Sequence, residues 1–316
     1  MLKPLNFIPV DTKISFMGFG RPAFIVSGVA VLASIVLFLV LGLNLGIDFR
    51  GGSVIRVSFE NDMSVAEVRN KVGGLGLGDV QIQEIGDKED NEVLIRIVQQ
   101  PGGDAAQQDA SRKLMDALGS DVELRSKDVV GPTVSGELAR QGTIAVVAAI
   151  FAVLAYIWFR FEWQFSLGAV AALVHDVLVT IGVFAILQIE FNLSIIAALL
   201  TIVGYSLNDT VVVFDRVREN LRKYKKLPLL DLLNQSINQT LSRTILTSVT
   251  TLIALLSLYF FGGEVISGFT FAMIWGVVIG TYSSVCIASP LLLILGVKRD
   301  WSGAGNTAKG EVAKAT

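Results

Sequence analysis

Six runs of apolar residues, each long enough to cross a bilayer, constrain this chain more than any other feature. A membrane-spanning helix needs about 20 apolar residues, because each residue rises 1.5 Å and the hydrocarbon core is roughly 30 Å thick. Hydrophobic residues make up 52% of the chain and charged residues 17%, which is typical of a protein with several spans. The runs are residues 22–45, 143–159, 165–187, 193–214, 245–261 and 269–295. The first has no clear cleavage site, so we expect a retained helix rather than a signal peptide.

Lysine and arginine are distributed unevenly over the segments that connect these runs. They occur before the first run, after the second, after the fourth and after the sixth, whereas the turns 188–192 and 262–268 contain none. Because cytoplasmic loops carry an excess of basic residues, both termini, 1–21 and 298–316, are expected in the cytoplasm. The last of these segments is rich in Gly, Ala and Lys, which predicts disorder.

Residues 46–141 separate the first two runs and form the long loop that this orientation places in the periplasm. Alternating residues predict strands at 53–59, 80–85, 92–98 and 122–129. Helical spacing predicts helices at 64–72, with Ser64 as cap and Glu67 three residues later, and at 107–118. The order βαββαβ predicts a ferredoxin-like α+β domain.

Residues 227–242 precede the fifth run and mix leucine and isoleucine with asparagine, glutamine and aspartate. This mixture predicts an amphipathic helix on the cytoplasmic surface of the membrane, before the fifth span.

The fourth run is unusual because it contains Asn208 and Asp209. A carboxylate at membrane depth costs at least about 2.5 kcal/mol, so it is expected to face a partner, a cavity or a water path. At about 100° per residue, Asn208 falls on a polar stripe with Asp209 at its edge. The opposite flank, predicted to face lipid, consists of Leu200, Val203, Leu207, Val211 and Phe214.

Arg243 begins the fifth run on the same side of the membrane and shares a stripe with serine and threonine residues. A pair between Asp209 and Arg243, direct or through water, is therefore predicted. Burial disfavours a charged carboxyl group and an opposite charge favours it, so changing access would load and release a proton. The alternative is a static salt bridge that fixes helix packing.

Asp176 lies near the middle of the third run, on a face with the small residues Ala169, Ala172 and Thr180. It is either a second protonatable site or a hydrogen-bonded packing residue. His175 is its neighbour in sequence but leaves the helix about 100° away, so the two are not expected to form a dyad. In the sixth run, a stripe of small residues predicts close helix packing. Its members are Ala272, Gly276, Gly280 and Ser284.

Several classes of chemistry lack their usual residues. One cysteine and one histidine exclude a disulfide framework and a multi-histidine metal site. HExxH and the P-loop are missing, and Asp209 and Asp215 lie about 120° apart on the helix, so they do not form a protease dyad. We expect no enzyme activity, no cofactor and no nucleic-acid partner.

Five motifs in order resemble the SecD/SecF family of protein-export membrane proteins, within the resistance-nodulation-division superfamily. The motifs are GIDFRGG at 46–52, VGPTVSGEL at 130–138, HDV at 175–177, NDTVVVFDRVREN at 208–220 and SRTILTS at 242–248. The resemblance covers roughly residues 5–297.

The resemblance implies a multi-pass protein of the bacterial inner membrane, with SecD, the SecYEG channel and YajC as partners. It implies that the proton-motive force assists translocation of a preprotein across the lipid bilayer after SecA has acted, with protons as the coupling ion. In the family the NDT aspartate and the SRT arginine belong to the proton path, and they match Asp209 and Arg243. Asn208 and Asp176 complete the set of candidates.

The first and second motifs lie where the chain passes between membrane and outer domain. Asp48, Arg50 and Glu137 are expected to couple domain motion to the first two helices, and simple turn chemistry is the alternative. The hinge candidates are Gly46, Gly51, Gly52, Gly131, Pro132 and Gly136.

Two rival functions stay open at this point. One is half of a proton-driven exporter of small molecules or lipids, and the other is a scaffold of the translocation machinery that transports nothing.

Overall fold

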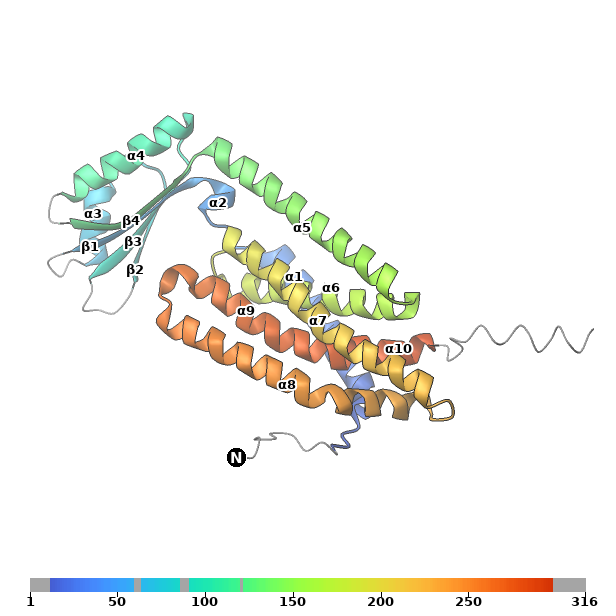
Figure 1. Cartoon of the computed structure of the whole chain (residues 1–316). Helices are drawn as coiled ribbons and strands as arrows, with labels where there is room; N and C mark the ends of the chain where they lie inside the picture. Colours follow the sequence, from blue (N-terminus) through green and yellow to red (C-terminus); the bar gives the residue numbers. More distant parts are fainter. Residues whose placement is uncertain (1–11, 60–63, 86–90, 120–121, 298–316) are drawn as a thin grey trace, which may run out of the picture.

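A bundle of long helices carries a small sheet domain at one end (Figure 1). This computed structural model describes residues 12–59, 64–85, 91–119 and 122–297. Within these residues, six helices are long and apolar enough to cross a membrane, which confirms the predicted fold class. The tail 298–316 and the first eleven residues lie outside the described part.

The spanning helices lie side by side, and the sixth is interrupted by a π-helical turn. They are α1 (Gly20–Leu41), α5 (Pro132–Arg160), α6 (Trp163–Leu187), α7 (Leu193–Lys223), α8 (Leu229–Phe261) and α9 (Glu264–Ser283), which continues through η2 (Ser284–Ala288) into α10 (Ser289–Leu295). The 3₁₀ turn η1 (Phe16–Phe19) precedes α1.

Several helices extend well beyond the apolar runs that predicted them. The helix α8 begins at Leu229, so the prediction of a separate amphipathic helix at 227–242 is wrong. Its residues form the first turns of the span, and Leu232 and Ile237 are buried in the core of the bundle. Hydropathy identifies only the apolar part of a helix. The helical backbone of α8 extends further towards the N-terminus, as far as the residue after Pro228.

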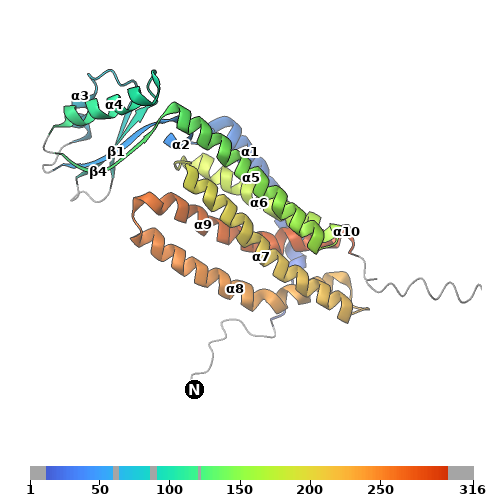
Figure 2. The same cartoon turned by 45° about the horizontal axis from the view of Figure 1, so that its top comes forward.

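The sheet domain has the predicted ferredoxin-like topology. Within the described residues, β1 (Gly52–Phe59), β2 (Val80–Ile85), β3 (Glu92–Val98) and β4 (Val122–Val130) form an antiparallel sheet in the order β2-β3-β1-β4. The helices α3 (Val65–Val72) and α4 (Gly103–Leu118) cover one face. Figure 2 shows the domain at the same end of the bundle after a 45° turn.

Alternation along the strands buries one face of the sheet against these two helices. Ile55, Ile95 and Ile97 have no exposed surface, and Val68 and Leu114 pack onto them from α3 and α4. The other face and the loops of the bundle together line a cleft of about 450 Å³. The predicted cap of α3 is also present, because Ser64 and Glu67 form a reciprocal capping box.

The stripe of small residues on α9 packs against α7 of this chain. A Cβ atom placed on Gly276 would lie 2.2 Å from Ile202, and one on Gly280 would lie 3.0 Å from Ser206. The glycines therefore allow the two helices to approach closely. This contact brings the end of α9 to the acidic residues of the bundle.

Candidate functional site

Asp176 on α6 and Asp209 on α7 are both buried in the bundle, with 1% and 7% of their surface exposed. Both carboxylates accept hydrogen bonds from the end of α9. The donors are the consecutive residues Ser283 and Ser284, which lie where α9 passes into the π-helical turn η2. Such turns within α-helices are frequent at functional sites.

Hydroxyl groups from two helices hold Asp209. Thr244 Oγ1 on α8 donates to Oδ1 at 2.6 Å, and Ser284 Oγ donates to Oδ2 at 2.5 Å. Among the described side chains, Asp209 and Arg243 form no ion pair, so the prediction of a direct pair is wrong. Arg243 is exposed, and its charge acts on Asp209 through space. One residue along α8 turns the side chain by about 100°, which is why Thr244 takes the place of Arg243.

The polar stripe of α7 lies on the surface of the bundle. Thr201, Gly204 and Asn208 are exposed, whereas Val203 and Phe214 on the opposite flank are buried. The prediction that this flank faces lipid is therefore wrong. The apolar flank packs against the hydrophobic core of the bundle, which includes Val213, Phe214 and Val217 of the same helix. Thr201 donates to the carbonyl oxygen of Ala197, but an exposed Asn208 amide at membrane depth needs a further partner, because lipid offers it no hydrogen bonds.

Asp176 accepts from three side chains. Ser206 Oγ and Ser283 Oγ donate to Oδ2 at 2.6 and 2.7 Å, and Nδ1 of His175 lies 2.9 Å from Oδ1. The expectation that His175 and Asp176 form no dyad is therefore wrong. Cβ directions do separate adjacent helical residues, but the side-chain torsions turn the imidazole back to the carboxylate. Small residues on the same face let α7 and η2 pack close to this site, as Gly168 does against Ala288.

The two serines differ from the other donors because each has a second acceptor in its own helix. Ser284 Oγ lies 3.0 Å from the carbonyl oxygen of Thr281, and Ser283 Oγ lies 3.1 Å from that of Gly280. A hydroxyl group has one hydrogen, so it donates to the carboxylate or to the carbonyl, and its lone pairs accept in either case. The serines are thus able to respond to the protonation of an aspartate.

The junction after α1 ties the sheet domain to α7. Gly46 N donates to the carbonyl of Phe191 at 2.9 Å, next to a parallel bridge between Leu45 and Phe191. The short helix α2 (Ile47–Arg50) follows. Its Asp48 Oδ2 accepts from the backbone N–H of Leu193, the first residue of α7, at 2.9 Å. Asp48 was expected to act on the first two helices, and in the structure it contacts α7 instead.

The glycines after α2 have backbone conformations that other residues rarely adopt. Gly51 has φ +71° and Gly52 has φ +130°, and a Cβ atom on Gly52 would lie 2.5 Å from the carbonyl oxygen of Ile97. Arg50 lines a hollow of about 350 Å³ beside β3. A second link joins the domain to the bundle, because Arg96 on β3 forms an ion pair with Glu190 in the turn before α7.

The junction before α5 is a single residue rather than a flexible turn. Gly131 is the N-cap of α5 and Pro132 is its first residue, so the helix begins directly after β4. A Cβ atom on Gly131 would overlap Asp104 at 1.6 Å. Glu137 accepts from Gln141 one turn later in the same helix, at 2.8 Å, and Gly136 lies within that helix. In the described part of the chain, this contact gives Glu137 no link to another helix.

Sequence reasoning missed the hydroxyl groups that hold the two carboxylates. Thr244 directly follows Arg243, Ser284 was assigned to the packing stripe, and Ser206 and Ser283 were not singled out. These donors lie at least 30 residues away in sequence from the carboxylates that they bind, so spacing along one helix does not identify them. In the described residues, no three His, Cys, Asp or Glu side chains lie together in a way that could hold a metal ion.

Comparison with known proteins defines the class of protein. Residues 110–298 match the C-terminal region of the protein export membrane proteins SecD and SecF, and residues 36–63 match the SecD/SecF GG motif. The chain therefore belongs to the SecD/SecF family, which confirms the resemblance of its motifs.

Within the family the chain is most simply compared with SecF proteins. It is 51% identical to the protein translocase subunit SecF of Cereibacter sphaeroides over 93% of each chain. It is 42% identical to SecF of Vibrio alginolyticus over 93% of this chain and 94% of that one.

The chain also matches one part of the longer SecDF proteins. The crystal structure of SecDF from Thermus thermophilus, described as a translocon-associated membrane protein, gives a TM-score of 0.78 at 34% identity, over 92% of this chain and 39% of that one. SecDF of Brucella abortus is 43% identical over 98% of this chain and 41% of its own length. The chain thus spans about two fifths of these proteins.

Proposed function

We propose that this chain is the SecF-type half of a SecD–SecF assembly that uses the proton-motive force to assist protein export. The names of its relatives support a role in protein translocation. In the proposed arrangement the protein lies in the bacterial inner membrane, with the sheet domain in the periplasm and both termini in the cytoplasm. It acts after SecA, at the SecYEG channel. The observation that carries the proton role is the buried Asp209 carboxylate, held by a serine that has a second acceptor.

Protonation of Asp209 would change the hydrogen bonds at the end of α9. The charged carboxylate accepts from Thr244 and Ser284. A protonated carboxyl group has one O–H, which donates to Ser284 Oγ, and the serine hydrogen then turns to the carbonyl oxygen of Thr281. Loss of the proton reverses both changes. Each cycle of protonation and deprotonation would change the hydrogen bonds of α9 at its π-helical turn. Arg243 and Asn208 would lie along the route by which the proton reaches Asp209.

Asp176 takes a structural role in this proposal. Three side chains on α6, α7 and α9 donate to it, so its oxygens are well satisfied and it joins three helices. A hydrogen-bonded buried carboxylate of this kind fixes packing.

The sheet domain would respond through the first turn of α7. Asp48 binds the N–H of Leu193, and Arg96 binds Glu190 just before it, so both links meet α7 at one end. Asp209 lies on the same helix, sixteen residues further along. A movement of α7 along its axis would therefore reach the domain through two polar contacts.

SecD is the partner that this reading requires. SecDF relatives contain a matching part and a further part, and we expect the exposed face of α7 around Asn208 to lie against a SecD bundle. Burial against a second bundle would give the Asn208 amide hydrogen-bond partners at membrane depth.

The test is export of a reporter preprotein into membrane vesicles that contain the chain and SecD, with and without a proton gradient. Asp209→Asn keeps the size of the side chain and removes its titration, so we expect the gradient-dependent part of export to be lost. Asp231→Asn is the matched control, because Asp231 is an exposed aspartate in the first turn of α8. An unchanged gradient response in Asp209→Asn, with the complex assembled, would favour the scaffold function.

A further inference from the structure

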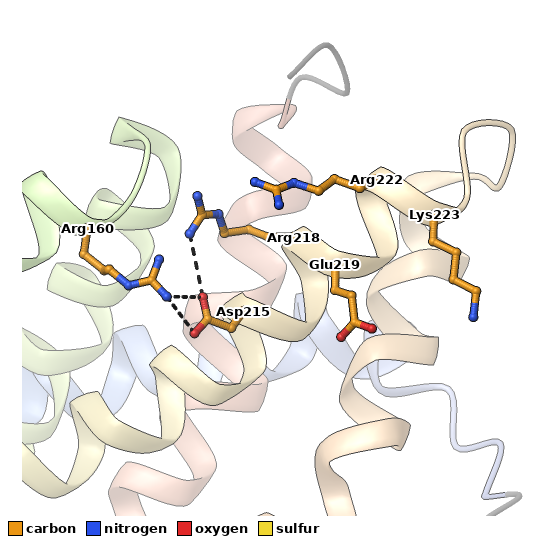
Figure 3. A pocket seen from close by; sticks show the side chains of 6 residues that line it. All are labelled: Arg160, Asp215, Arg218, Glu219, Arg222 and Lys223. Atoms are coloured by element: carbon orange, nitrogen blue, oxygen red, sulfur yellow. Dashed lines mark hydrogen bonds and ion pairs between the residues drawn. The ribbon is translucent and has the colours of Figure 1, made fainter. Parts of the chain in front are cut away.

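A basic hollow of about 630 Å³ opens at the end of the bundle away from the sheet domain, where α5 and α7 end (Figure 3). Four cationic and two anionic side chains line it, so the lining has a net charge of +2. These are Arg160, Arg218, Arg222 and Lys223, with Asp215 and Glu219.

Two arginines of the hollow, Arg160 and Arg218, are held in place by contacts with the protein. Arg160 Nη2 donates to both oxygens of Asp215, at 2.9 and 3.0 Å, and Arg218 lies 3.7 Å from the same carboxylate. Both guanidinium groups lie over the ring of Phe161, at 4.9 and 5.3 Å from its centre. The charge of Arg222 also acts on Arg218. Asp215 thus neutralises part of the charge of two fixed guanidinium groups, the exposed Arg222 adds a third, and an added anion would relieve their repulsion.

Large exposed aromatic side chains adjoin Arg160 along the chain, where α5 ends and α6 begins. Trp158 and Phe159 precede Arg160 on α5 and are 68% and 90% exposed, and Trp163 at the start of α6 is 53% exposed. Tryptophan at the ends of spanning helices marks the level of the lipid headgroups. The cluster therefore lies where a phosphate group and the start of an acyl chain occur together.

We infer that the hollow binds the phosphate headgroup of an anionic phospholipid, with the acyl chains against Trp158 and Phe159. Planar guanidinium groups bind phosphate oxygens in pairs, and the Asp215 and Phe161 contacts fix two of them in advance. A free phosphate would use the same cations but would gain nothing from the aromatic side chains. This site goes beyond the export function, because it assigns a lipid ligand to residues outside the proton route.

The test compares spin-labelled phosphatidylglycerol with spin-labelled phosphatidylcholine around the full chain in phosphatidylcholine nanodiscs. We expect the wild type to prefer phosphatidylglycerol. Arg222→Gln is expected to lower this preference more than about tenfold, because it removes a charge-assisted hydrogen bond to the phosphate as well as one basic charge, whose loss alone costs about fivefold. Arg222→Lys is expected to keep part of it. Lys226→Gln is the matched control, because it removes the same charge from an exposed position four residues further on.

Equal losses in Arg222→Gln and Lys226→Gln would show attraction to diffuse surface charge and would overturn the proposal, as would a wild type without preference. Inorganic phosphate forms the second arm. If it displaces phosphatidylglycerol from the wild type, the hollow is a site for free anions rather than for lipid. If the lipid preference persists in phosphate and is lost in Arg222→Gln alone, the lipid site is supported.

Discussion

Asp176 and Asp209 lie in the same bundle and bind consecutive serines, but their surroundings differ. Asp176 is 1% exposed and accepts from His175, Ser206 and Ser283. Asp209 is 7% exposed, accepts from Thr244 and Ser284, and is the neighbour of the exposed Asn208. The difference teaches that burial alone does not identify a proton carrier. Each aspartate has one serine donor with a second acceptor, so the distinguishing features of Asp209 are its smaller number of donors and the exposed polar residue Asn208 beside it.

Removal of each carboxylate gives the largest expected contrast. Asp176→Ala leaves His175 and Ser206 without their acceptor, so we expect a loss of about 3 kcal/mol or more in the free energy of unfolding. Asp209→Ala leaves Thr244 unsatisfied while Ser284 retains the Thr281 carbonyl, and about 1–3 kcal/mol is expected. Unfolding of the full chain in lipid measures both. A larger loss for Asp209→Ala would reverse the assignment of the structural site.

Close packing of α9 against α7 positions the serines at both aspartates, so a larger side chain at Gly276 is expected to have the next largest effect on stability. Gly276→Val places carbon atoms on Ile202 and is expected to cost about 1–3 kcal/mol, because the helices must separate. Gly28→Val on α1 is the control, since a Cβ atom there meets nothing within 4 Å. Similar unfolding free energies for the two variants would show that close α7–α9 packing does not support the sites.

Variants of the two consecutive serines distinguish an effect on stability from an effect on the proton response. Ser283→Ala is expected to lower the unfolding free energy by about 1 kcal/mol and to leave gradient-dependent export unchanged, because Asp176 keeps two other donors. Ser284→Ala removes the donor that switches at Asp209, so the gradient response should fall with a similar stability loss. Export and unfolding are measured on the same preparations. Equal gradient responses would contradict the role of Ser284.

The smallest effect is expected at the junction with the sheet domain. Asp48→Ala removes an acceptor from the first N–H of α7, and such a cap contributes roughly 0.5–1 kcal/mol. Asp48→Asn keeps an acceptor oxygen and serves as the matched variant. Export with a gradient is expected to decrease in Asp48→Ala and to be retained in Asp48→Asn. The same export rate in both variants would show that this contact does not connect the domain to α7.

Much of this fold could be predicted from the sequence, because the patterns that specify its helices and strands are local. The strands β2 and β3 occupy the predicted ranges, since alternation reports which face is buried. The Ser64 cap and the six spans follow from single motifs and from run length. Helix ends at Pro132 and Leu229 were missed, because polar turns outside the hydrocarbon carry no hydropathy signal.

The site was predictable in part, because an intramembrane carboxylate is visible in any sequence whereas its partners depend on helix rotation. A wheel drawn for one helix cannot show that Thr244 rather than Arg243 faces Asp209. It also cannot show that the polar stripe of α7 lies outside the bundle, because the rotation of α7 depends on the side chains of the helices that pack against it. The π-helical turn after Ser283 has no sequence signature of its own.

The most direct test of the central claim is infrared difference spectroscopy of the full chain with SecD in lipid, recorded across a pH titration. A protonated carboxyl group has a C=O band that an ionised one lacks. We predict that one titrating carboxyl band of the wild type is retained in Asp176→Asn and missing in Asp209→Asn, whereas the bands of the other carboxyl groups are common to all three proteins. A band that survives in Asp209→Asn and disappears in Asp176→Asn would contradict the account and move the proton to Asp176.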